Sequence, residues 1–390
     1  MKSYLSIRKY GLEHLVLIIC ALFLAFAVIS CDSESNSNDQ AVPTPTPSVP
    51  PPAGPTPSPA PTPSATPTPS PSPAPGGSIL EPGGTLSEVA QTFDYVGNGN
   101  ERQMLDYYAI SGLPSQTVSD ISTSGLEGSR PAIVFFHGGA WLVGDKEDVL
   151  DEPVILDAAE MAGFHLISVG YRLAGINPDN APWPAQVHDA NAAIRWIKQN
   201  AEMLDVDPDK LVIVGGSAGA HIAAAVAMGP DVDELQGPEN LVPPTSTDVA
   251  LAFLIFGAYD MNMIVDDAFD LVDDMTCDPE DLLGIVAVLA LLECPLSLNI
   301  LDPLMNCSQQ DLDSASPVVY VDSSDPPSYL VHGRDDCTVP FQQTVGMETA
   351  LDMAGVTNET MIVTGGEHDS MSLMLDVQNI LNFIDDNLSP

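Results

Sequence analysis

From about Gln91 to the C-terminus, the sequence predicts an α/β fold in which helices cover both faces of a mostly parallel central sheet. Three observations predict this class. Short apolar runs rich in β-branched and aromatic residues alternate with segments of helical periodicity, as strands and crossover helices do. The runs are apolar almost throughout, which is typical of strands buried on both faces. Turn residues bound each run.

The expected elements follow in chain order. The run RQMLDYYAI predicts an antiparallel strand at the edge of the sheet. The main strands are expected in RPAIVFFHG, FHLISVGYR, KLVIVGGS, VALAFLIFG, PSYLVHG and ETMIVTGG. Helices are expected at Pro184–Leu204, where Val187, Ile194 and Ile197 share one side, and at Ala218–Met228, Phe341–Ala354 and Ser370–Asn387.

One long insertion, about residues 261–317, interrupts this alternation. Long loops in a compact domain are usually functional, so we expect a lid over a site. Its apolar run Leu282–Leu292 is too short to span a bilayer, which favours a buried or cap helix.

Four cysteines in this part of the chain, Cys277, Cys294, Cys307 and Cys337, are even in number. In an exported chain this favours two disulfides, with three pairings that the sequence does not separate. These disulfides would cross-link the lid, and Cys337 would attach it to the main domain. A metal site is the weaker interpretation, because there is no CxxC pair and there are no attendant histidines.

Residues 1–30 have the pattern of an export signal, with basic residues followed by the apolar run Leu15–Ile29. The following VISC resembles the lipobox of bacterial lipoproteins, which implies that Cys31 is lipidated and becomes the mature N-terminus. An uncleaved anchor is the alternative. Residues 31–90 form a Pro/Thr/Ser-rich linker that its prolines keep extended, and residues 91–390 form the folded domain. We expect an exported, membrane-anchored lipoprotein, on the periplasmic side or at the cell surface; its oligomeric state is not predicted.

The charge balance argues against nucleic acid as a partner. The chain has 54 acidic and 11 basic residues and a formal net charge of −43. Such a surface repels phosphates. The acids are scattered along the chain, so a solvated acidic surface explains them and they say little about a substrate.

Ser217 stands in the G-x-S-x-G sequence Gly215–Gly219, between a predicted strand and a predicted helix. There a serine occupies a sharp strand-to-helix turn that exposes its hydroxyl, and small neighbours leave room for the turn. A glycine-rich phosphate loop is the alternative, but neither G-x-G-x-x-G nor GK[ST] is present. Ser217 is therefore the predicted nucleophile.

A serine nucleophile needs a base and an acid that orients the base. His368 follows the last predicted strand on a glycine-rich loop, where α/β sheets carry site residues, and is the predicted base. His137 and His332 both end strands as His-Gly, where histidines often brace loops. The acid should follow a strand between serine and histidine, and Asp335 and Asp336 both do so.

Backbone amides would receive the negative charge that acyl transfer places on the substrate oxygen. Gly138 and Gly139 follow the strand that ends at Phe136 and let the backbone approach that oxygen closely. The amide of Ala218, next after the serine, is the expected third donor.

Taken together and in order, six motifs resemble the α/β-hydrolase superfamily and, within it, the group of carboxylesterases and bacterial feruloyl-esterase-like enzymes. The motifs are HGGAW, YRLA, PAQVHDANAAIRWI, GGSAGAHIAA, HGRDDCTVP and GGEH. In that group the acid stands in an H-G-x-x-D-x-x-V-P pattern, which implies Asp336 here. The hormone-sensitive-lipase branch usually shows HGGG and GDSAGG, from which Ala140 and Gly216 depart.

The resemblance implies a serine hydrolase of small-molecule carboxylic esters that forms an acyl-enzyme and requires no metal or organic cofactor. An amidase or peptidase of the same fold is one alternative. A non-catalytic cell-surface binding protein on this scaffold is another, although such proteins usually lose the serine or the histidine.

Overall fold

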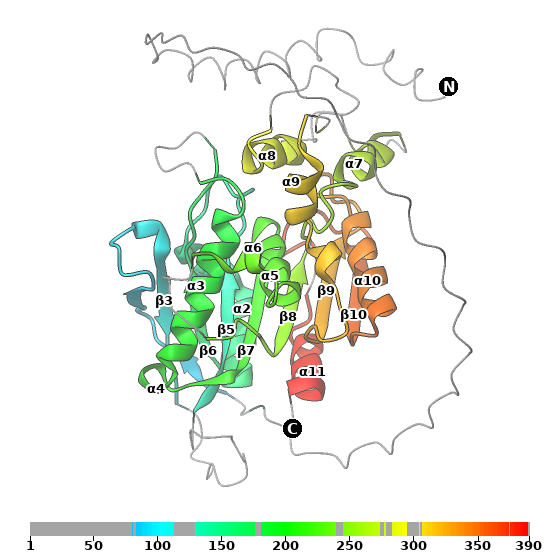
Figure 1. Cartoon of the computed structure of the whole chain (residues 1–390). Coiled ribbons are helices and arrows are strands. Elements are labelled where there is room, and N and C mark those ends of the chain that lie inside the picture. Colours follow the sequence, from blue (N-terminus) through cyan, green and yellow to red (C-terminus); the bar gives the residue numbers. More distant parts are fainter. Residues whose placement is uncertain are drawn as a thin grey trace, which may run out of the picture. The chain divides into compact units, whose positions relative to one another are not determined.

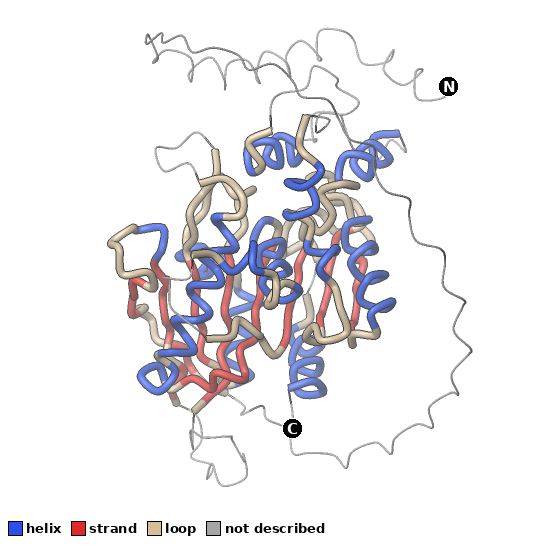
Figure 2. The backbone as a smooth tube through the Cα atoms, in the orientation of Figure 1, coloured by secondary structure: helices blue, strands red, loops and turns tan. Residues whose placement is uncertain are grey.

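The computed structural model describes residues 80, 83–112, 129–175, 181–238, 245–273, 277, 283–294, 304, 306–373 and 375–388. The predicted signal, Cys31, most of the linker and parts of the insertion lie outside the described residues. In the described part, a central sheet has helices on both of its faces (Figure 2). This is the expected α/β class with a mostly parallel sheet.

The central sheet has eight strands in the order β10-β9-β8-β7-β5-β6-β3-β2. From β10 to β6 all neighbours are parallel, whereas β3 and β2 are antiparallel to theirs. A separate pair, β1 (Thr85–Leu86) and β4 (Ile110–Ser111), forms a small antiparallel sheet. The strands of the central sheet are β2 (Gln91–Asp94), β3 (Met104–Tyr108), β5 (Arg130–Phe136), β6 (His165–Val169), β7 (Val206–Gly216), β8 (Leu251–Ile255), β9 (Ser328–Gly333) and β10 (Asn358–Val363).

The edge of the sheet differs from the prediction. The expected antiparallel strand is β3, but β2 pairs with it and takes the edge position. This four-residue strand has no apolar run, and side-chain contacts with other elements hold it in place. The Phe93 ring lies 5.1 Å from the Trp196 ring, and Thr92 Oγ1 donates to Asp106 Oδ1 at 2.6 Å.

The helices pack against the sheet in two apolar layers, one on each face of the sheet. Helices α3 (Ala185–Gln199), α5 (Ala218–Met228) and α10 (Gln342–Ala354) pack with one layer, and α2 (Pro153–Ala162) and α11 (Val377–Leu388) pack with the other. Short helical segments complete the main domain: η3 (Glu101–Gln103), η4 (Lys146–Asp151), α4 (Ala201–Leu204), α6 (Asp233–Gln236) and η7 (Pro317–Tyr320).

The last helix begins later than predicted, at Val377 rather than Ser370. The carboxylate of Asp369 accepts hydrogen bonds from the amides of Met371 and Ser372, which makes a turn there. Asp376 Oδ1 then accepts from the amide of Gln378, as a capping side chain does at the start of a helix.

The insertion contains α7 (Ile264–Asp273), α8 (Leu283–Leu291) and α9 (Gln309–Ser314), which gather at one end of the sheet (Figure 1). The apolar run predicted as a buried or cap helix is α8, in which Val288 and Leu291 are fully buried. No helix among the described residues is long and apolar enough to cross a membrane.

Two disulfides form, as predicted, and the structure decides their pairing. Cys294–Cys307 closes a loop within the insertion. Cys277–Cys337 joins the insertion to the loop after β9, with the two Cα atoms 5.6 Å apart. The insertion is therefore attached covalently to the main domain.

Candidate active site

The sheet register brings the predicted site residues to one end of neighbouring strands. Phe136, the last residue of β5, pairs with Gly215 of β7, and Gly216 pairs with Ile255 of β8. The next pairings are Ile255 with Val331 and His332 with Ile362. The loops after β5, β7, β9 and β10 consequently meet at the carboxyl edge of the sheet, where parallel sheets carry their sites.

Ser217 lies at the turn between β7 and α5 with φ 55° and ψ −122°, a conformation that side-chain-bearing residues rarely adopt. Its amide is tied to the carbonyl of Ile255 at 2.9 Å. The two outer glycines of the motif make the turn possible. A Cβ on Gly215 would lie 2.3 Å from the backbone of Gly219, and one on Gly219 would lie 2.0 Å from the carbonyl oxygen of Phe136. The motif is thus required by close backbone contacts on both sides of the serine.

A chain of hydrogen bonds joins the three predicted catalytic residues. His368 Nε2 lies 3.0 Å from Ser217 Oγ, and His368 Nδ1 lies 2.6 Å from Asp336 Oδ2. Because Asp336 can only accept when ionised, Nδ1 carries the proton and Nε2 is left to accept from the serine hydroxyl. Asp335, the other candidate acid, is exposed to solvent and does not make this contact.

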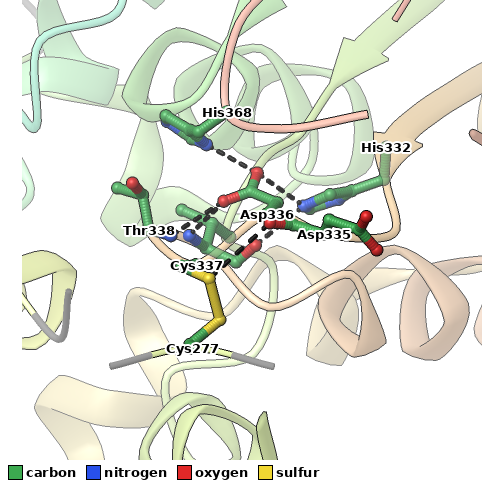
Figure 3. Close-up of a disulfide and its surroundings, with 8 residues drawn as sticks. Cys277, His332, Asp335, Asp336, Cys337, Thr338 and His368 are labelled. Atoms are coloured by element: carbon green, nitrogen blue, oxygen red, sulfur yellow. Dashed lines mark hydrogen bonds and ion pairs between the residues drawn. A yellow bond between two sulfur atoms is a disulfide. The ribbon is translucent and has the colours of Figure 1, made fainter. Parts of the chain in front are cut away.

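The Asp336 carboxylate is fully buried and receives four donors (Figure 3). Oδ1 accepts from the amides of Thr338 and Val339 at 2.8 and 2.9 Å. Oδ2 accepts from His368 and also lies 3.2 Å from His332 Nε2. Burial alone would raise the pKa of Asp336, but the hydrogen bonds from the two histidines lower it to about 2. Asp336 is therefore ionised at neutral pH.

His332, predicted to brace a loop, also contacts the carboxylate of Asp336 directly. Its Nδ1 lies 2.7 Å from Thr344 Oγ1, and its Nε2 lies 2.9 Å from the carbonyl of Val339 as well as close to Asp336. Nε2 faces two acceptors and so carries the proton, while Thr344 donates to Nδ1. The sequence feature that could have predicted this contact is the His332-Gly333 pair just before Asp336.

The three predicted oxyanion-hole amides face no protein acceptor among the described residues. In the part of the chain that the structure describes, the N–H groups of Gly138, Gly139 and Ala218 donate no hydrogen bond to another residue. Gly138 lies against the turn at Ser217, since a Cβ built on it would be 3.6 Å from the Cβ of Ser217. Gly139 has φ 101°, and a Cβ there would lie 2.3 Å from the carbonyl oxygen of Val143. Glycine is required at this second position both for its φ and for space.

A second buried contact joins this loop to the insertion. Trp141 Nε1 donates to His221 Nδ1 at 3.1 Å, and His221 Nε2 lies 2.9 Å from the carbonyl of Ala315. Burial lowers the pKa of His221 to about 4, so the ring is neutral and can accept at one nitrogen while donating at the other.

The strand order and the loops gathered at the carboxyl edge of the sheet are those of the α/β-hydrolase fold, and solved structures support this fold. A carbohydrate esterase from gut microbiota matches with a TM-score of 0.57 and 22% identity over 79% of this chain and 100% of that chain. An esterase of the archaeon Pyrobaculum calidifontis matches with a TM-score of 0.55 and 22% identity over 78% of this chain and 87% of that one. Because both structures are only 22% identical to this chain, they support its fold and nothing further. The BD-FAE family model matches residues 120–351, more than half of the chain, and the protein belongs to that family.

Curated relatives include two Mycobacterium tuberculosis proteins. The probable carboxylic ester hydrolase LipM is 30% identical over 227 residues, which are 58% of this chain and 46% of LipM. The esterase LipQ is 27% identical over 304 residues, which are 76% of this chain and 61% of LipQ. The chain thus spans less than two thirds of the length of these relatives.

Proposed function

We propose that the protein is a serine hydrolase of carboxylic esters. The observation that carries the proposal is the hydrogen-bond chain from Ser217 Oγ through His368 to the buried, ionised Asp336. A serine, a neutral imidazole and a fixed carboxylate in this order form a general-base-activated nucleophile. The ester hydrolase and esterase relatives support esters as the substrate class.

The reaction follows from this geometry in two halves. Ser217 Oγ attacks the ester carbonyl carbon while His368 Nε2 takes the hydroxyl proton, and Asp336 stabilises the imidazolium. The free amides of Gly138, Gly139 and Ala218 would receive the oxyanion. As the tetrahedral intermediate collapses, the C–O bond to the alcohol breaks and His368 returns the proton to the leaving oxygen. In the second half, a water molecule gives a proton to His368 and attacks the acyl carbon. The bond from that carbon to Ser217 Oγ then breaks, His368 returns the proton to Oγ, and the carboxylic acid leaves.

Replacing the nucleophile tests the proposal. Ser217→Ala should lower kcat for an aryl acetate by roughly 10⁶-fold, to background, because no other group can form the acyl-enzyme. Ser324→Ala, at an exposed serine before β9, is the matched control and should keep wild-type activity. Substantial activity of the Ser217 variant, or a wild type that a fluorophosphonate fails to label at Ser217, would overturn the mechanism. A wild type that cleaved matched anilides faster than aryl esters would make it an amidase.

We also propose that a lipid on Cys31 anchors the enzyme to a membrane of an exporting cell. The lipobox-like sequence supports this, as do the two disulfides, which are stable in oxidising compartments. Cys31→Ser should abolish labelling by a palmitate analogue and move the protein from the detergent phase to the aqueous phase. Unchanged labelling would show that Cys31 is not the lipid site.

A further inference from the structure

Tyr171 follows β6 and is fully buried beside the loop that carries Gly138 and Gly139. Its hydroxyl donates to the carbonyl oxygen of His137 at 2.7 Å and lies 3.4 Å from that of Gly138. The Tyr171 and His137 rings stack, with centroids 4.1 Å apart and planes within 10° of parallel. His137 Nδ1 in turn lies 2.7 Å from the carbonyl oxygen of Gly138.

The His137 ring is held in the tautomer that this last contact needs. A carbonyl oxygen only accepts, so Nδ1 must carry the proton. Burial lowers the pKa of His137, which keeps the ring neutral and leaves Nε2 without a proton. Gly144 allows the ring to sit there, because a Cβ at that position would lie 2.4 Å from His137 Nδ1.

Two consecutive peptide units are therefore anchored by their carbonyls. The unit that joins His137 to Gly138 is held by Tyr171, and the unit that joins Gly138 to Gly139 is held by His137. In a planar trans peptide the N–H points opposite to the C=O. Because the two carbonyls are held towards Tyr171 and His137, the N–H groups of Gly138 and Gly139 point the opposite way. Among the described residues, neither N–H group has a protein acceptor.

We propose that Tyr171 is a positioning residue that, together with His137, orients the amides of Gly138 and Gly139 as oxyanion donors. This inference rests on the proposed serine-hydrolase function. Donors that are fixed before the reaction stabilise the developing charge without reorganising during it, and this is the main source of their catalytic effect. Without the Tyr171 hydroxyl, the first peptide unit loses its buried anchor and can rotate.

Tyr171→Phe keeps the ring stack on His137 and removes only the hydroxyl. We expect kcat for an aryl ester to fall about 10- to 100-fold, less than the loss of a whole donor, with KM nearly unchanged. Tyr107→Phe is the matched control, because the Tyr107 hydroxyl is also buried and donates to a backbone carbonyl, that of Leu204, at 2.6 Å. It should lower the melting temperature to a similar extent while leaving kcat unchanged.

The ratio of kcat/KM for an ester to kcat/KM for its thionoester separates positioning from damage to the fold. Sulfur accepts hydrogen bonds poorly and is larger than oxygen, so well-placed donors favour the ester, and misplaced donors favour it less. The ratio does not depend on the fraction of active enzyme. We expect it to fall several-fold in Tyr171→Phe and to stay at the wild-type value in Tyr107→Phe.

Each outcome has a definite meaning. An unchanged ratio in Tyr171→Phe, with an active wild type and an inactive Ser217→Ala, would overturn the role of Tyr171 and leave the proposed function intact. An active Ser217→Ala would overturn the proposed mechanism itself. A wild type that hydrolyses no ester would overturn both.

Discussion

The dipeptide His-Gly directly follows β5 and ends β9, and the two histidines act on different partners. His137 and His332 are both fully buried. His137 holds the carbonyl of the next residue, whereas His332 lies against the carboxylate of Asp336 and the carbonyl of Val339. The same local sequence thus supports a pair of peptide dipoles at one strand end and a full negative charge at the other.

The glycines of the two pairs admit close neighbours at their own strand ends. Gly138 lies beside Ser217, while a Cβ on Gly333 would lie 2.3 Å from the carbonyl oxygen of Gly366, in the loop that leads to His368.

The two strand ends are also attached to the insertion in different ways. The β5 end reaches it through hydrogen bonds from Trp141 to His221 to Ala315, and the β9 end through the Cys277–Cys337 disulfide. We therefore expect changes at the β9 end to act through charge and covalent attachment, and changes at the β5 end to act through peptide orientation.

Of the changes that compare these two strand ends, the one with the largest expected effect is at Asp336. Asp336→Asn keeps the shape of the side chain but removes the charge and favours the wrong tautomer of His368, so kcat should fall by about 10⁴-fold. Asp335→Asn changes the exposed neighbour in the same way and should leave kcat unchanged. The assay is steady-state hydrolysis of an aryl acetate at neutral pH. Equal losses in the two variants would contradict the assignment of the acid.

The two disulfides should contribute unequally to stability. Cys277–Cys337 closes a separation of 60 residues and Cys294–Cys307 one of 13. In the chain-entropy account, their replacement by paired serines should cost about 4 and about 3 kcal/mol of unfolding free energy, respectively. Only the first replacement should also lower kcat, because Cys337 adjoins Asp336. Denaturant titration and kinetics of both double variants provide the measurement, and a greater loss of kcat on removing Cys294–Cys307 would reverse the comparison.

The smallest expected effect is a pH dependence of stability. The folded-state pKa of Asp336 is lowered from 3.8 to about 2, so its contribution of about 2 kcal/mol is present above pH 4 and is lost as the pH falls towards 2. His332→Phe removes one of the hydrogen bonds that lower this pKa, and the loss over the same range should be smaller. Denaturant unfolding of both proteins at pH 5, 4, 3 and 2 tests this. Parallel curves would show that His332 does not stabilise the charge.

Much of the fold and of the site could be predicted, because the informative residues stand next to strand ends. Gly215–Gly219 predicts a strand-to-helix turn because an apolar run precedes it and a helical pattern follows it, and His368 follows an apolar run on a glycine-rich loop. Such local patterns report backbone conformation directly. The sequence does not predict the edge strand β2, because this strand has no apolar run. It predicts too early a start for α11, because the turn at Asp369 depends on side-chain hydrogen bonds.

The α/β class, the turn at Ser217 and the residue types proposed for acyl transfer follow from the sequence alone. The three-dimensional fold was needed to establish the disulfide pairing, the contact of Asp336 with His368, and the anchoring of the Gly138 loop by Tyr171. Each of these contacts joins residues that lie apart in the chain, by 13 positions in Cys294–Cys307 and by 32 or more in the others. Sheet register and packing, rather than any local pattern, bring such residues within hydrogen-bonding or bonding distance.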